Sequence, residues 1–234
     1  MWRRVSRSSA CFGGACFAGR LPLISGTRSA RRSQVKTLVR SFAIAVALYA
    51  GAASAADKVT TFPIDQVMGK ADAPITIIDY SSTTCGHCAN LHKTALPKIK
   101  SEWVDTGKAK LIYRDFPTGP AALSLGASMI AHCSGKDRYF GVLGMIMEQQ
   151  DKWMGAANPL DALKKMVRLA GMTSEDVDAC LQRQDLATAI QDRARDGAKT
   201  YGIESTPTLI INGKVVEGAA PYEEFDKILK AAAK

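Results

Sequence analysis

Acidic residues are absent from the first 55 positions of this 234-residue chain. Those positions hold nine Lys or Arg residues, whereas positions 56–234 carry 22 basic and 22 acidic side chains. The net charge of +9 therefore belongs to the N-terminal segment, and the neutral remainder argues against a nucleic-acid-binding protein. With 47% apolar residues, the chain is able to bury a core, so a disordered protein is not expected.

The acid-free segment has the layout of an export signal. An apolar stretch at residues 42–50 follows basic residues and leads to Ala53 and Ala55, small residues that suit a signal peptidase. The stretch is too short for a stable membrane span, and no basic run follows it. We therefore predict a leader over residues 1–55, cleavage near Ala55, and a soluble mature protein in the periplasm.

Three other interpretations of the leader stay open. Residues 1–40 are rich in Arg and Ser, which also fits a mitochondrial transit peptide, and Arg31 and Arg32 before an apolar run resemble a twin-arginine signal. Alternatively, residues 1–34 reflect a mis-assigned start codon and translation begins at Val35. N-terminal peptide mapping of the precursor tests this last idea.

The remaining chain opens with the pattern of a βαβ unit. Residues 73–82 and 108–117 are short apolar runs typical of buried strands. Between them, apolar residues recur every four positions from Leu91 to Trp103, which predicts an amphipathic helix, and Pro97 should kink it. A strand, a helix and a strand in this order predict two parallel strands.

The middle and the end of the chain differ in periodicity. Residues 119–200 show helical spacing and no convincing strand, whereas residues 206–218 read as a hairpin that turns at Asn212-Gly213. A last helix is expected from about Pro221 to Ala233. The sequence thus predicts one α/β domain, with residues 56–118 and 201–234 forming its two parts around a helical insertion at 119–200.

Cysteine is scarce after the leader, where only Cys85, Cys88, Cys133 and Cys180 occur. An even number of cysteines in an exported protein favours disulfides. A bridge between Cys133 and Cys180 would close a loop of nearly fifty residues and stabilise the fold by roughly 4 kcal/mol at most. We interpret this bridge as structural.

Cys85 and Cys88 enclose Gly86 and His87 in a Cys-Gly-His-Cys motif directly after the first strand. Cys85 should lie just before the helix, where unpaired backbone N–H groups and the helix dipole stabilise a thiolate. Cys88 lies one helical turn further, close enough for a disulfide. His87 is expected to favour the Cys85 thiolate and so to make the pair oxidising.

A Cys-x-x-Cys motif also has structural and metal-binding uses. Cys85 and Cys88 could form a structural bridge or half of a zinc site, and a metal chaperone could use them to hold copper or zinc. However, the chain has no second CxxC and only three histidines, so redox chemistry is favoured and no metal site is expected. Of these histidines, His92 and His132 are interpreted as ordinary helix residues.

The Cys85–Cys88 motif after an apolar strand, with "STPT" at 205–208 before the hairpin, resembles the thioredoxin superfamily. The helical insertion and the stretches "ADAPITIIDY", "RDFP" and "TPTLIING" narrow the resemblance to DsbA-like thiol:disulfide oxidoreductases. The resemblance covers residues 57–234. It implies an α/β thioredoxin fold, a βαβ unit plus a β-hairpin and a C-terminal helix, with an inserted α-helical subdomain.

The same resemblance implies roles for individual residues. Cys85 would be the exposed nucleophile and Cys88 the buried resolving cysteine, while Thr206 and Pro207 match the cis-proline loop that binds the substrate peptide. Asp79 matches a buried acid that would accept the Cys88 proton. The alternative for this residue is a partly exposed aspartate at the strand end that pairs with Arg114.

The resemblance also implies a reaction and partners. We expect disulfide donation to exported polypeptides with free thiols, reoxidation by a DsbB-like membrane oxidase, no bound cofactor and a monomeric protein. The Gly86-His87 dipeptide is that of protein disulfide isomerase rather than of strong oxidases. A reductase or isomerase held reduced by another membrane partner is therefore the alternative.

Overall fold

Residues 64–234 are described in the structure, which is a computed structural model. The expected leader over residues 1–55, its cleavage near Ala55 and the alternative start at Val35 lie outside these residues. Within residues 64–234, no helix has the length and apolar character needed to cross a bilayer.

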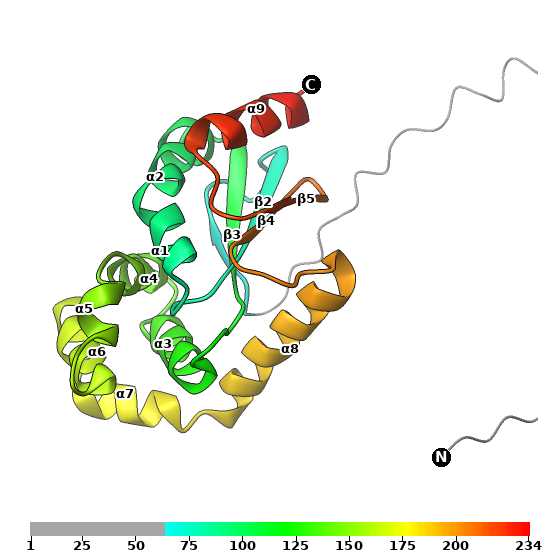
Figure 1. The fold of residues 1–234 in the computed structure, drawn as a ribbon. Coiled ribbons are helices and arrows are strands. Elements are labelled where there is room, and N and C mark those ends of the chain that lie inside the picture. Colours follow the sequence, from blue (N-terminus) through cyan, green and yellow to red (C-terminus); the bar gives the residue numbers. More distant parts are fainter. Residues whose placement is uncertain (1–63) are drawn as a thin grey trace, which may run out of the picture. The chain divides into compact units, whose positions relative to one another are not determined.

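A five-stranded sheet lies at the centre of the described region (Figure 1), in the order β1-β3-β2-β4-β5. β2 and β3 run parallel, as the βαβ pattern predicts, and every other neighbouring pair is antiparallel. β1 was not expected, because three residues are too few to show a periodicity. The strands are β1 (Gln66–Met68), β2 (Ile75–Ser81), β3 (Ala109–Asp115), β4 (Thr208–Ile211) and β5 (Lys214–Glu217).

The helix after β2 is interrupted rather than continuous. It consists of α1 (Gly86–Lys93), α2 (Ala95–Ile99) and a π-helical turn over Lys100–Val104. The break falls at Thr94, which has φ −115° and ψ −68°. Because the ring of Pro97 clashes with the carbonyl of the residue four positions earlier, a break at the α1–α2 junction is the expected consequence.

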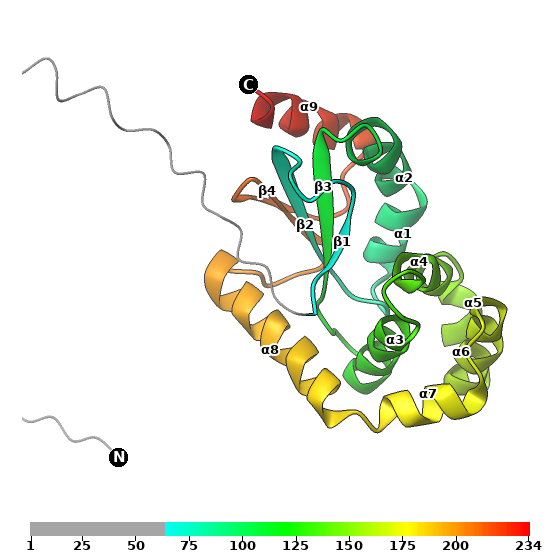
Figure 2. The same cartoon turned by 180° about the vertical axis from the view of Figure 1, so that it is seen from behind.

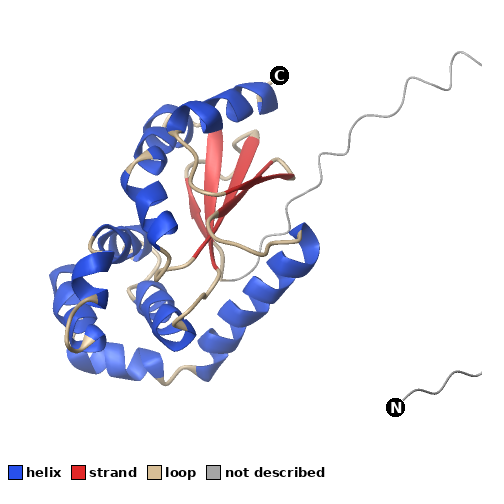
Figure 3. Ribbon diagram, viewed as in Figure 1, coloured by secondary structure: helices blue, strands red, loops and turns tan. Residues whose placement is uncertain are grey.

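Helices fill the segment between β3 and β4, and no strand interrupts them. Figure 3 shows this segment as helices joined by loops, with α8 running back to the sheet. The predicted thioredoxin fold with a helical insertion is therefore confirmed. The helices are α3 (Ala121–Cys133), α4 (Tyr139–Glu148), α5 (Gln150–Met154), α6 (Pro159–Val167), α7 (Ser174–Leu181) and α8 (Gln184–Tyr201).

Both faces of the sheet are covered. Figures 1 and 2 show α1, α2 and α9 (Tyr222–Ala232) on one face of the sheet. Apolar side chains of these helices pack against that face. On the other face α8 approaches so closely that a Cβ at Gly197 would lie 2.4 Å from the Tyr80 ring. These contacts leave the central strand β2 fully buried.

The C-terminal hairpin forms where the sequence predicts it. β4 and β5 are joined by Asn212 and Gly213, which have φ values of 45° and 83°. Two residues with positive φ make a tight turn whose twist matches the flanking strands. The hairpin places the residues before β4 beside the start of α1.

Candidate active site

Cys85 is the N-cap residue of α1. Its Sγ accepts a hydrogen bond from the backbone N–H of Cys88 at 3.4 Å, as its predicted place at the helix start requires. The Cys88 side chain, the Thr206 side chain and the backbone N–H groups of Cys88 and His87 all donate to the sulfur. Together they lower the pKa of Cys85 to about 5, although partial burial opposes the shift. Cys85 is thus a half-buried thiol that ionises easily.

Cys88 has the opposite environment. Its side chain is fully buried among apolar residues of the helical insertion, and its Sγ accepts a hydrogen bond from the Ser82 N–H at 3.4 Å. Burial raises the pKa of Cys88, and the nearby charge of Asp79 raises it further. Both cysteines carry free thiols here, so the structure shows the reduced form of the motif.

The loop before β4 lies against the reactive sulfur. The Cys85 thiol donates to the Thr206 carbonyl oxygen at 3.3 Å, and the Thr206-Pro207 peptide bond is cis. Pro207 is buried, and its carbonyl accepts a hydrogen bond from the Gly218 N–H at 2.8 Å. The structure therefore brings Cys85, Thr206 and Pro207 together from segments 121 positions apart.

Asp79 lies on β2 and is fully buried. Its carboxylate accepts a hydrogen bond from Ser81 Oγ at 2.5 Å and lies 3.3 Å from Nε2 of His92. The alternative of a partly exposed Asp79 paired with Arg114 is wrong. Asp79 aligns with Tyr113 of β3, so Arg114 projects from the other face of the sheet, where it binds Asp65 at 2.8 Å.

Gly86 and His87 are both exposed at the surface. A Cβ at Gly86 would meet no atom within 4 Å, so nothing in the fold requires glycine there. His87 reaches the Cys85 sulfur through its backbone N–H. The two residues between the cysteines are therefore free to contact a partner.

A family model described as Thioredoxin matches residues 61–231. The chain belongs to the thioredoxin family. Among solved structures, this thioredoxin-family chain is similar to alpha-DsbA1 of Wolbachia pipientis, with 25% identity, a TM-score of 0.69, and coverage of 76% of this chain and 95% of that one. BdbD of Bacillus subtilis, in its oxidised form, shares the fold with 20% identity, a TM-score of 0.63, and coverage of 74% and 95%.

Sequence relatives point the same way. A Rickettsia bellii protein named as a candidate protein-disulfide oxidoreductase is 31% identical over 67% of this chain. Disulfide bond formation protein D of Bacillus subtilis is 23% identical over 70% of this chain and 75% of its own length. This thioredoxin-family chain spans 61% of the length of the Rickettsia bellii protein. The expected resemblance to DsbA-like proteins is confirmed.

Sequence reasoning missed Gln150, the first residue of α5. Its side chain is buried, and Nε2 donates to the carbonyls of Thr83 at 2.8 Å and Cys85 at 3.1 Å. The helical insertion of this thioredoxin-family chain therefore holds the loop that carries the reactive cysteine. A second bond from the insertion joins Ser124 Oγ to Ser82 Oγ at 2.8 Å. No local pattern marks either residue, because both act across more than 40 positions.

The other cysteine pair lies within the helical insertion. A disulfide joins Cys133 at the end of α3 to Cys180 in α7, across 47 positions. Cys180 is buried beside Met129, Leu186 and Ile190. The bridge thus links two helices that are far apart in the sequence.

The two helix histidines both face carboxylates. His92 pairs with Asp79, and His132 lies 2.7 Å from Asp115. Within residues 64–234 no group of three or more His, Cys, Asp or Glu side chains is arranged to hold a metal ion. Each histidine is therefore engaged in a buried pair of this thioredoxin-family fold.

Proposed function

We propose that this protein is a thiol:disulfide oxidoreductase that donates disulfides to exported polypeptides. The observation that carries the proposal is the inequality of the two thiols, since Cys85 is half-buried with a pKa of about 5 whereas Cys88 is buried with a raised pKa. A pair of this kind has one sulfur that a partner reaches and one that resolves the exchange.

The reaction starts from the Cys85–Cys88 disulfide. A substrate thiolate attacks Cys85 Sγ, the bond between the two cysteines breaks, and Cys88 leaves with the electron pair and gains a proton. A second substrate thiolate then attacks the substrate sulfur of the mixed disulfide, and Cys85 leaves as a thiolate. The substrate has lost two electrons, and the protein holds them as a dithiol.

The easily ionised Cys85 favours this direction. A low pKa makes Cys85 a good leaving group, and a stabilised thiolate favours the reduced form over the disulfide. The reduced form is therefore the more stable product, which is what an oxidant of other thiols requires. Thr206 and Pro207 would align the substrate chain, since they contact or adjoin the sulfur that is attacked.

The site of action and the partners complete the proposal. The N-terminal segment has the layout of an export signal, so we place the mature protein in the periplasm as a monomer. Continued turnover then needs a DsbB-like membrane oxidase that takes two electrons from the dithiol. Cys85 and Cys88 carry the chemistry themselves, and the proposal includes no bound cofactor.

The equilibrium reduction potential of the Cys85–Cys88 pair in a glutathione buffer tests the direction. We expect a value between about −120 and −180 mV, the span from a strong oxidant to protein disulfide isomerase. A value near about −270 mV, like that of thioredoxin, would favour the alternative of a reductase kept reduced by another membrane partner. Mass analysis follows Cys133 and Cys180 separately.

A further inference from the structure

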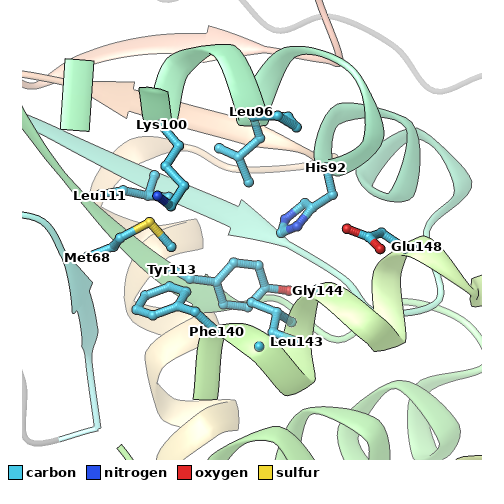
Figure 4. Close-up of a pocket in the computed structure, with 12 residues that line it drawn as sticks. Met68, His92, Leu96, Lys100, Leu111, Tyr113, Phe140, Leu143, Gly144 and Glu148 are labelled. Carbon is cyan, nitrogen blue, oxygen red and sulfur yellow. The ribbon is translucent and has the colours of Figure 1, made fainter. Parts of the chain in front are cut away.

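A cavity of about 420 Å³ lies beside α1, between α2, β3 and α4 (Figure 4). Its lining is mostly apolar, with His92, Lys100 and Glu148 as the charged or titratable side chains besides the buried Tyr113. Lys100 and Glu148 are exposed, so the cavity reaches solvent. Neither cysteine of the motif lines this cavity, and neither does the Thr206-Pro207 loop, so its opening is separate from the face that meets substrate.

His92 separates this cavity from the buried acid of the active site. The imidazole lines the cavity, and its Nε2 lies 3.3 Å from Oδ2 of Asp79. Asp79 is fully buried, and its other carboxylate oxygen accepts a hydrogen bond from the Ser81 hydroxyl. The Tyr113 ring packs edge-on against the imidazole, with centroids 5.8 Å apart. This contact holds the imidazole of His92 between Asp79 and the cavity. Thus His92 connects Asp79 to solvent.

Each round of exchange moves a proton at Cys88. This thiol is fully buried and its pKa is raised, so it loses its proton only to a nearby base when it attacks a mixed disulfide. Asp79 is close enough for its charge to act on Cys88. A carboxylate sealed from water, however, has to pass that proton on before the next round.

We propose that His92 carries the Cys88 proton between Asp79 and the solvent that reaches the cavity. This inference rests on the proposed exchange chemistry but not on its direction. During resolution, Asp79 takes the proton of Cys88, and the electron pair of Cys88 Sγ attacks Cys85 Sγ. The bond from Cys85 to the partner sulfur breaks, and the partner leaves as a thiolate. Asp79 then passes the proton to Nε2 of His92, whose Nδ1 releases one to solvent.

The charged groups around His92 suit this role. Asp79 on β2 faces one edge of the ring, and Glu148 on α4 lines the same cavity as the ring. Lys100 on the π-helical turn is the one cation in the lining. A proton on His92 thus has the Asp79 carboxylate on the side from which it arrives and the Glu148 carboxylate in the cavity into which it leaves.

Reaction with Ellman's disulfide separates the two cysteines in one stopped-flow experiment. The Cys85 thiolate releases the first thionitrobenzoate, and attack by Cys88 on the resulting mixed disulfide releases the second. The full chain is used with Cys11→Ser and Cys16→Ser, so that only the motif reacts, and Cys88→Ser identifies the second phase by removing it. A parent chain with neither phase would contradict both the proposed exchange chemistry and the proposed proton transfer through His92.

His92→Gln is the decisive variant, because a glutamine amide can still hydrogen-bond to Asp79 but neither takes up nor releases a proton near neutral pH. We expect the second phase to slow by about a hundredfold and to lose its dependence on pH near neutrality, while the first phase is unchanged. In His92→Ala, added imidazole should enter the enlarged cavity and restore the second phase in proportion to its concentration.

His132→Gln is the matched control, since it alters a second buried pair, with Asp115 at 2.7 Å, that does not line the cavity. We expect both of its phases to match the parent chain. The proposed proton transfer through His92 would be wrong if His92→Gln kept the rate and pH profile of the second phase. It would also be wrong if imidazole failed to restore that phase in His92→Ala, because a merely structural histidine is not replaced by a free base.

Discussion

The two cysteine pairs of the described region differ in whether the two sulfurs of a pair have similar surroundings. Cys133 and Cys180 are already bridged and lie among the apolar side chains of α3, α7 and α8. Cys85 and Cys88 are free thiols, one at a helix start beside the Thr206 carbonyl and one fully buried. The pKa of one is lowered and that of the other raised. Unequal surroundings make a pair exchangeable, whereas a shared apolar setting makes a bridge inert.

The largest expected effect comes from Cys85→Ser. Because Cys85 is the one sulfur of the motif that a partner reaches, this change should reduce oxidation of a dithiol peptide to the uncatalysed rate. The assay follows disulfide formation in the peptide by mass. Cys133→Ser with Cys180→Ser is the control and should keep most of the activity. A Cys85→Ser protein that still oxidised the peptide would contradict the assignment.

The double variant Cys133→Ser with Cys180→Ser should lower stability more than Cys85→Ser does. Removing the Cys133–Cys180 bridge opens a loop of 47 positions and should lower the free energy of unfolding by at most about 4 kcal/mol. Urea unfolding of the parent chain and the double variant measures the difference, and the Cys85–Cys88 reduction potential should stay the same. An unchanged unfolding midpoint, or a changed Cys85–Cys88 reduction potential, would contradict the assignment of one pair to stability and the other to redox exchange.

A smaller effect is expected from Gln150→Met, which keeps the size of the side chain but removes its amide. The Thr83 and Cys85 carbonyls lose a buried donor, so the free energy of unfolding should fall by about 1–3 kcal/mol. Gln149→Met, at the preceding half-buried residue, is the control. Equal losses in the two variants would show that the hydrogen bonds from Gln150 to the active-site loop contribute nothing to stability.

Much of the fold could be predicted because it depends on local patterns. Apolar runs locate β2 and β3, Asn212-Gly213 locates the hairpin, and Pro97 predicts the interruption that occurs at Thr94. β1 could not be predicted, because its pairing with β3 depends on the completed sheet.

The candidate site was predicted only where its residues are close in sequence or match a family motif. Cys85 and Cys88 form a motif, and Asp79 was predicted because its position before Cys85 matches that of a buried acid in the family. His92 was interpreted as an ordinary helix residue, although it lies on the face of α1 that meets β2. Gln150 reaches the site from a helix 65 positions away, and helix packing of this kind leaves no mark in the local sequence.

The ionisation of Cys85 tests the central claim most directly. Thiolate absorbance of the reduced protein is followed from pH 3 to 10, with Cys85→Ser as the blank. One thiolate should form with a midpoint at about 5. Because this pKa lies below that of an ordinary cysteine, ionisation of Cys85 stabilises the folded dithiol fully above about pH 8.5, and this stabilisation is lost as the pH falls from there to about 5. A midpoint near about 8.5, the value of an ordinary cysteine, would contradict the account of an unequal, oxidising pair.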